Sequence, residues 1–182
     1  MAVEPPASAY EMAHDVEAEA LATFAVLVDN EPGVLHRVVG LFAARGYNIE
    51  SLTVAETDRR AHTSRITIVT RGTPHVLAQI EAQLQKMVST RHVQNVTKDP
   101  NGVERELALV KVRGVGAERV EALRLADIFR ARVIDTTIES FIFEVTGAPL
   151  KIDKFVDLMR PLGLVEVSRT GVLSIERGVE TL

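Results

Sequence analysis

The sequence contains no cysteine and no tryptophan, and aromatic residues make up only 4% of its 182 positions. Without cysteine the chain has no disulfide, no thiolate nucleophile and no cysteine-based zinc site. Its first 20 residues carry five acids and no Lys or Arg, which leaves 20 acidic and 21 basic residues elsewhere. This nearly neutral, ring-poor body argues against a nucleic-acid surface, which needs a basic face and stacking aromatics.

The chain also lacks the segments that direct proteins into or across membranes. No apolar run approaches the length of a membrane span, and the N-terminus has neither the basic start nor the apolar core of a signal peptide. Residues 1–20 are rich in Ala, Glu and Pro. We therefore expect a cytoplasmic protein that begins with a flexible N-terminal arm at 1–20.

Sequence patterns of catalytic and metal sites are missing as well. The five histidines are scattered, with no pair four positions apart and no HExxH motif. No GxSxG motif, phosphate-binding P-loop or paired-carboxylate motif is present either. We accordingly expect no catalytic residues and no metal site, and we interpret the histidines as solvated or locally capping groups.

What the sequence does contain is a regular succession of strand-like and helix-like segments. The apolar run LATFAVLV at 21–28 is typical of a buried strand, and apolar side chains at helical spacing follow it. Gly46 ends that helix, and Thr73-Pro74 begins a second one. Further strands are expected at 47–57, 63–70 and 91–97, and the first helix is expected to bury Leu35, Val38, Val39 and Phe42.

The same β-α-β-β-α-β order recurs in the second half of the chain. Residues 99–103 form a linker by composition, and strand and helix patterns alternate again over 104–182. LFAARGYNI at 41–49 aligns with IFRARVIDT at 128–136, which indicates two copies of one unit. In the second unit we expect strands at 164–168 and 172–175 to finish the sheet, and a helix over 117–130 to bury Val120, Leu123 and Ile128.

This order predicts an α+β fold with two tandem ferredoxin-like (βαββαβ) domains, at 21–98 and 104–182. In such a domain both helices cover one face of a four-stranded antiparallel sheet. The other face and the sheet edges stay uncovered. We therefore expect the chain to form a homodimer or higher homo-oligomer.

The turn Asn30-Glu31-Pro32-Gly33, before the first helix, is a candidate binding site. The start of a helix offers free N–H groups and a partial positive charge, which together bind anions. Gly33 has no Cβ, so a carboxylate or another backbone can approach closely, and the Asn30 amide can both donate and accept hydrogen bonds. A purely structural explanation competes with this one, in which Asn30 caps the helix and Gly33 allows close packing.

A second candidate segment, Tyr47-Asn48-Ile49, leads into the next strand. In a ferredoxin-like fold this strand runs parallel to the first strand, so its start lies far from the beginning of the first helix. A site that uses both segments must therefore span two subunits.

Gly114-Val115-Gly116 suggests a different function, because two glycines between a strand and a helix, with Asp135 further on, make part of a dinucleotide-binding fingerprint. However, Arg119 stands where the third glycine belongs. The two segments after this helix also have the pattern of an antiparallel hairpin, unlike the doubly wound sheet that a dinucleotide site needs. A simple turn is the better interpretation.

Longer stretches of sequence resemble a known family. VDNEPGVLHRVVGLFAARGYNIESLTVAETD at 28–58, followed by SRITIVT at 64–70, resembles the regulatory small subunit of acetohydroxyacid synthase, also called acetolactate synthase. The resemblance extends over about residues 21–178 and includes VERELALVKV, IFRARVID and the ending E-V-x-R-T-G-V. It implies that 21–98 is an ACT domain, an amino-acid-sensing ferredoxin-like module, and that 104–182 is a related C-terminal domain.

The resemblance also implies a non-catalytic, regulatory function. Members of this family associate with a large catalytic subunit that carries thiamine diphosphate, Mg²⁺ and FAD, raise its activity, and confer feedback inhibition, usually by valine. The effector lies between two ACT domains. A free-standing amino-acid sensor without an enzyme partner is the alternative.

By motif position, the resemblance assigns the effector contacts to both candidate segments. From the strand–helix turn these would be Asn30, Gly33, Val34 and Leu35, with Asn48 and Ile49 supplied by the opposing subunit. Thr57 and Gln79 stand at positions that the family associates with feedback sensitivity. The second domain has Asp135 in place of Asn48, so we do not expect it to bind the effector.

Overall fold

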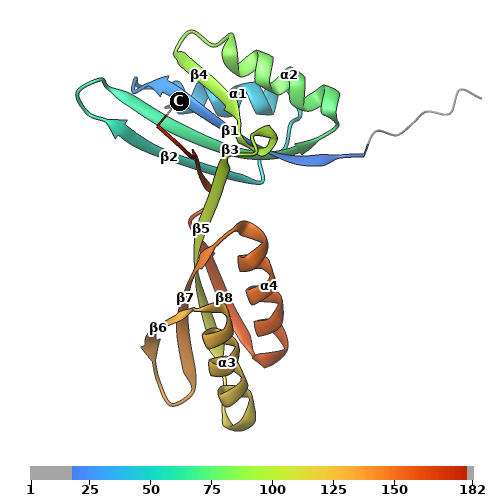
Figure 1. Ribbon diagram of the computed structural model, residues 1–182, viewed down its shortest axis with the longest axis vertical. Helices are drawn as coiled ribbons and strands as arrows, with labels where there is room; N and C mark the ends of the chain where they lie inside the picture. Colours follow the sequence, from blue (N-terminus) through green and yellow to red (C-terminus); the bar gives the residue numbers. More distant parts are fainter. Residues whose placement is uncertain (1–17, 180–182) are drawn as a thin grey trace, which may run out of the picture.

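The structure is a computed structural model that describes residues 18–179. Two α+β units lie end to end, and the long strand β5 (Gly102–Arg113) runs from the first into the second (Figure 1). Most of the expected N-terminal arm falls outside the described residues. Its last residue, Ala20, already belongs to the first strand.

The first unit is a four-stranded sheet in the order β2-β3-β1-β4, in which every pair of neighbours is antiparallel. Both helices pack on one face, where their buried side chains share a core with Phe24, Val26 and Ile68. The predicted ferredoxin-like order is thereby confirmed. Its elements are β1 (Ala20–Asp29), α1 (Val34–Arg45), β2 (Ser51–Asp58), β3 (Thr63–Gly72), α2 (Pro74–Gln85), β4 (Thr90–Asn95) and the short 3₁₀ helix η1 (Val96–Lys98).

Helix α1 buries a narrower stripe than its sequence predicts. Val34, Val38 and Phe42, spaced four residues apart, face the sheet. Leu35 and Val39 instead remain 39% and 38% exposed. The apolar residues of α1 thus form a stripe wider than this sheet alone can cover, and two of them are left for another contact.

Helix α2 begins at a side-chain cap, as Thr73-Pro74 predicts. The Thr73 hydroxyl accepts a hydrogen bond from the Val76 amide at 3.4 Å, and Pro74 occupies the first helical position. We expect Thr73→Ala to lower the free energy of unfolding by about 1 kcal/mol, because a helix N–H loses its acceptor. Thr73→Ser keeps the hydroxyl and should lose well under half of that in urea denaturation. Equal losses in both variants would contradict a capping role.

The second unit repeats this architecture with the sheet order β6-β7-β5-β8, again antiparallel throughout. The rings of Phe129 and Phe143 each lie against Phe155 in its core, with centroids 5.3 and 6.1 Å away. Its elements, besides β5, are α3 (Gly116–Phe129), β6 (Arg132–Thr136), β7 (Ser140–Gly147), α4 (Pro149–Met159), the 3₁₀ helix η2 (Arg160–Leu162), β8 (Leu164–Arg169) and β9 (Leu173–Glu176).

The prediction for α3 was wrong about which side chains face inward. Val120 and Ile128 are 68% and 66% exposed, and Leu123 is also exposed. Ala122 and Ala126 are buried instead, with Leu125 and Phe129 packed beside them. These four positions form an i, i+3, i+4, i+7 stripe. Two alanines on that stripe let the α3 backbone approach its neighbours closely, so the larger aliphatic residues are left outside.

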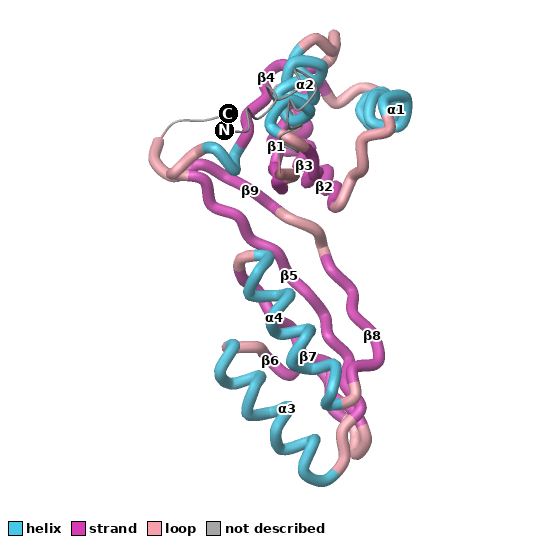
Figure 2. Tube along the Cα trace, turned by 90° about the vertical axis from the view of Figure 1, so that its right-hand side faces the viewer, coloured by secondary structure: helices cyan, strands magenta, loops and turns pink. Residues whose placement is uncertain are grey.

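Strand β9 does not simply finish the second sheet, as residues 172–175 were expected to do. It pairs only with the first residues of β5, Gly102 to Arg105. The ribbon formed by these two segments lies across the face of the first sheet that the helices leave free (Figures 1 and 2). Val172, just before β9, is buried there, its amide donates to the Ser51 hydroxyl at 3.2 Å, and its carbonyl accepts from the Thr53 hydroxyl at 2.9 Å.

Other segments of the same chain cover the helix-free face of the first sheet, so the expectation that this face stays uncovered is wrong. Thr23, Thr67 and Val69 point away from the helices and are nevertheless buried. Arg65 lies on the same face, and burial lowers the pKa of its guanidinium from the ordinary value. The helix-free face therefore does not depend on another subunit, whereas the edge strand β2 stays uncovered beyond Thr53.

Candidate functional site

Gly33 adopts a backbone conformation that explains why a glycine stands at the start of α1. Its φ of 85° and ψ of −2° lie in the left-handed region, which side chains disfavour. A Cβ built at Gly33 would meet no atom within 4 Å, so the position is open. The explanation that Gly33 permits close packing is therefore wrong, and the space beside it is free for a ligand.

The first backbone amides of α1 are only partly occupied. No side chain caps this helix, and the Val34 amide donates to the Glu31 carbonyl at 3.2 Å. Within residues 18–179, the amides of Gly33, Leu35 and His36 have no acceptor. These N–H groups, at the positive end of a 12-residue helix, suit a carboxylate.

Asn30 does not cap α1, contrary to the purely structural explanation. Its side chain is exposed, and Nδ2 donates to Oε1 of Glu56, near the end of β2, at 3.3 Å. The turn at 30–33 is also held by Arg37, which donates to Glu31 at 3.1 Å and to the Ser89 hydroxyl at 2.5 Å. Asn30 thus lies on a fixed turn with its amide directed at neighbouring polar groups.

Asn48 and Ile49 lie between the end of α1 and the start of β2. The Asn48 side chain donates to Glu50 at 3.1 Å, and the backbone carbonyl of Asn48 accepts from the Thr70 hydroxyl at 2.6 Å. Ile49 is half-buried and packs against the core of the first unit. The segment therefore presents one polar and one apolar side chain from a well-supported backbone.

One subunit does not bring these two segments together. The backbone N–H of Asn30 donates to the carbonyl of His62, just before β3. The backbone carbonyl of Asn48 instead accepts from Thr70, near the other end of β3. Those two positions on one extended segment are eight residues apart, which corresponds to about 27 Å at the rise of an antiparallel strand. If the turn at 30–33 and residues 47–49 bind one ligand, each subunit therefore supplies only half of a given site.

Thr57 and Gln79 each lie beside one of the two halves. Thr57 follows Glu56, the hydrogen-bond partner of Asn30, and its hydroxyl donates to the Thr63 carbonyl at 3.4 Å. Gln79, on α2, accepts a hydrogen bond from the Tyr47 hydroxyl at 3.4 Å. Tyr47 directly precedes Asn48, so Gln79 supports the opposite half.

The geometry of the second unit rules out the dinucleotide-type site. Strands β5 and β6 are separated by β7, and all three are antiparallel to their neighbours, whereas the fingerprint requires adjacent parallel strands. The Arg119 guanidinium, in place of the third glycine, lies 3.9 Å from the centroid of the Phe141 ring. Gly114 to Gly116 is therefore a turn.

Residues 18–179 contain neither a metal-binding cluster nor a membrane-spanning helix. No group of three His, Asp or Glu side chains is arranged to hold a metal ion. None of the helices in this range combines the length and the apolar character of a membrane span.

Comparison with known proteins connects both units to one family. A family model described as an AHAS small subunit-like ACT domain matches residues 24–92, and one described as the small subunit of acetolactate synthase matches 105–178. The acetolactate synthase small subunit of Haemophilus influenzae is 44% identical, over 86% of this chain and 96% of its own length. The isozyme 3 small subunit of Escherichia coli is 46% identical over 84% and 93%.

A solved structure agrees with these relatives. The crystal structure of the acetolactate synthase small subunit from Thermotoga maritima superposes with a TM-score of 0.77 at 38% identity, covering 88% of this chain and 99% of that one. Sequence and three-dimensional structure thus agree over nearly all described residues. The chain belongs to the family of acetolactate synthase small subunits.

Proposed function

We propose that this chain is the non-catalytic regulatory subunit of an acetolactate synthase in branched-chain amino-acid biosynthesis. It raises the activity of a large catalytic subunit and confers feedback inhibition by valine bound between two of its ACT domains. Thiamine diphosphate, Mg²⁺ and FAD belong to the catalytic partner. The family matches over both units support this assignment.

One observation carries the location of the effector: the two half-sites lie at opposite ends of the edge strand β2. The Asn30 side chain donates to Glu56 near the end of β2, and Asn48 lies three residues before the start of β2. If β2 strands of two copies pair antiparallel, the start of each lies beside the end of the other. Such pairing unites Asn30 of one copy with Asn48 of its partner, twice per dimer.

Exposed apolar residues on the same edge support this dimer. Val54 on β2 is 43% exposed, and α1 lies on the β2 side of the sheet (Figure 2). Leu35 and Val39, the two apolar residues that α1 leaves outside its own core, would be covered by the second copy. In a two-fold arrangement of this kind, the same surface patch of both copies is buried in the interface.

The residues then have distinct roles toward valine. The free amides of Gly33 and Leu35 hold the carboxylate at the positive end of α1. The Asn30 and Asn48 amides complete the contacts to the carboxylate and the ammonium group, and Ile49 lines a small apolar pocket beside Val34. Valine regulates the enzyme only if it binds two states of the assembly unequally, with a coupling of about 1–3 kcal/mol.

Reconstitution tests this function. A purified catalytic subunit is assayed with and without the chain while valine, leucine or isoleucine is titrated. We expect the chain to raise the activity and valine to lower it only when the chain is present. Unchanged activity without co-purification of the two subunits would instead favour a free-standing amino-acid sensor.

A further inference from the structure

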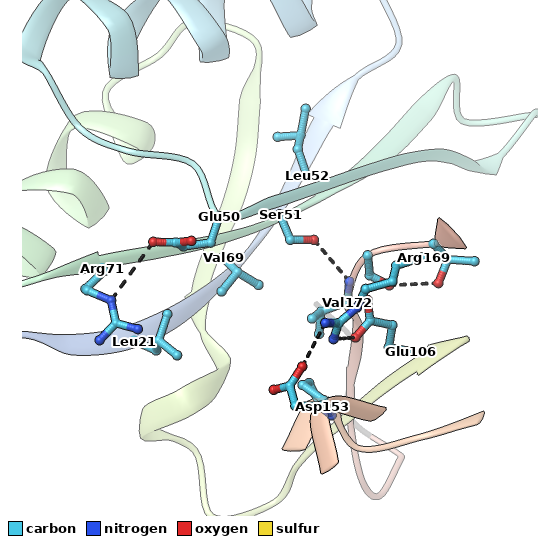
Figure 3. A pocket seen from close by; sticks show the side chains of 13 residues that line it. Leu21, Glu50, Ser51, Leu52, Val69, Arg71, Glu106, Asp153, Arg169 and Val172 are labelled. Atoms are coloured by element: carbon cyan, nitrogen blue, oxygen red, sulfur yellow. Dashed lines mark hydrogen bonds and ion pairs between the residues drawn. The ribbon is translucent and has the colours of Figure 1, made fainter. Parts of the chain in front are cut away.

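A cleft of about 480 Å³ lies between the two units, on the helix-free side of the first sheet (Figure 3). Strands β1 to β3 of the first unit form one wall. The other wall comes from β5, the start of α4 and the end of β8 with the segment leading to β9. Its size is that of a small-molecule site, and none of the proposed valine contacts lines it.

Arg71 supplies a positive charge that the protein uses little. Its Nε lies 4.0 Å from Glu50 Oε1, and its side chain is 48% exposed. Neither of its other two guanidinium nitrogens has a hydrogen-bond partner within the described part of the chain. Arg71 can therefore donate two hydrogen bonds to a carboxylate, in the bidentate geometry that guanidinium groups favour.

On the opposite wall Asp153 has a free carboxylate oxygen. Its Oδ1 accepts from Arg169 Nη1 at 2.7 Å, while Oδ2 has no partner among the described residues. Arg169 itself is already paired on this wall, because Glu106, which is buried, accepts from its Nε at 2.7 Å and its Nη2 at 2.5 Å. The available charge on this wall is thus negative.

Between the two charged groups the lining is apolar. Leu21 and Val69 lie between Arg71 and Asp153 in Figure 3, and Leu21 is 47% exposed. Val172 contributes from the side of the second unit. A ligand in this cleft would therefore meet a cation at one end, an anion at the other and aliphatic side chains between them.

We propose that the cleft is a second binding site, for a small α-amino acid with an aliphatic side chain. Its carboxylate pairs with Arg71, its ammonium group with Asp153, and its side chain covers Leu21 and Val69. This site is separate from the one proposed between two ACT domains.

The lining disfavours other ligand classes. Three carboxylates and two guanidinium groups line the cleft, so a phosphate or another multiply charged anion would be repelled. No aromatic residue lines it, so a nucleotide base would find no ring to stack on. A zwitterion is neutral overall and matches the opposed charges.

The position of the cleft gives such a ligand a consequence for regulation. It would bridge the two units, which otherwise meet here through Val172 and the hydroxyls of Ser51 and Thr53. Glu50, beside Arg71, also accepts from Asn48 of the effector half-site. Occupancy of the cleft would therefore fix the angle between the units and favour one orientation of Asn48.

Calorimetric titration tests the proposal in the full chain carrying Gly33→Asp, a substitution that should block the site proposed between ACT domains. We expect this chain to bind one L-valine or L-leucine and to bind neither N-acetyl-L-valine nor L-valinamide, which each lack one charge. Arg71→Met and Asp153→Asn, each added separately, should weaken binding at least about tenfold. Lys98→Met and Asp157→Asn, which remove more exposed charges of the same signs elsewhere, should leave it unchanged.

Two results would overturn the cleft site: absence of amino-acid binding in the Gly33→Asp chain, or equal affinities in the Arg71, Asp153 and control variants. Urea denaturation of each variant verifies that it is folded. The proposed valine site fails separately, if Gly33→Asp leaves inhibition of the reconstituted enzyme intact, because that readout does not depend on Arg71 or Asp153.

Discussion

Gly33→Asp should abolish valine inhibition of the reconstituted enzyme while activation by the chain persists. The new carboxylate would stand beside the free amides at the start of α1, where we place the carboxylate of valine. Two like charges about 4 Å apart near a protein surface repel by about 4 kcal/mol before screening. We therefore expect the valine concentration for half-inhibition to rise by roughly 100-fold or more.

Gly33→Asn is the matched control for this experiment. Asn and Asp have nearly the same size, and both tolerate the left-handed conformation that Gly33 adopts better than other side chains do. The backbone strain is thus similar in the two variants, and only the charge differs. A Gly33→Asn enzyme as insensitive to valine as Gly33→Asp would show that strain or bulk, and not repulsion of a carboxylate, causes the loss.

Mixing two variants tests whether the site is shared. Asn48→Ala should also weaken inhibition, because it removes the opposing half of each site. A dimer of one Gly33→Asp chain and one Asn48→Ala chain has one site with both substitutions and one site with neither. Partial recovery of valine inhibition on mixing is therefore expected. Failure to recover in verified mixed dimers would place both residues in one subunit's site or in none.

The second large effect is expected from Arg169→Met, which should lower the free energy of unfolding by about 3 kcal/mol. The substitution leaves the Glu106 carboxylate, which is only 4% exposed, without the two hydrogen bonds from Arg169. Removing one member of a buried pair commonly costs about 3–5 kcal/mol. We take the lower end because the Arg169 side chain is 36% exposed, so water can partly replace it.

Arg160→Met provides the comparison within the same unit. Arg160 pairs with Asp157 at 3.1 Å, but both side chains are about two-thirds exposed, so its loss should change stability by less than about 0.5 kcal/mol. Hydrogen bonds to Glu106 raise the pKa of Arg169 above its ordinary value. A raised arginine pKa keeps Arg169 charged well into alkaline solution, so the pair should still stabilise the unsubstituted chain at about pH 9. Equal unfolding midpoints would contradict a structural role for the buried pair.

The two-unit fold could be predicted because local patterns and long-range packing agree in most elements. The alternation in β1, the Thr73-Pro74 start of α2 and the repeated element order all correspond to the structure. Helix α3 is different, because the size of Val120 and Ile128 favoured burying them, while close packing selected Ala122 and Ala126. Which face of a helix packs against a sheet depends on the shape of the sheet surface, and the spacing of apolar residues alone does not reveal it.

The candidate sites, too, were only partly predictable from the sequence. Residue types identified Asn30 and Gly33 as a possible anion site, but the left-handed backbone, the free amides and the open space became visible only in three dimensions. The cleft between the units had no sequence signal at all. Arg71 and Asp153 are ordinary charged residues of a strand and a helix, and only the packing of two units brings them to opposite walls.

The path of β9 has a consequence for how the protein is made. Residues 20–98 contain every strand and helix of the first unit, yet one face of its sheet is covered by Val172 and the strand that follows. During synthesis this face, with Thr67 and Val69, therefore stays open to water until Val172 and β9 have left the ribosome. A chain that stops before residue 172 should expose this face, and a peptide spanning 170–177, added in trans, should restore its protection from hydrogen exchange.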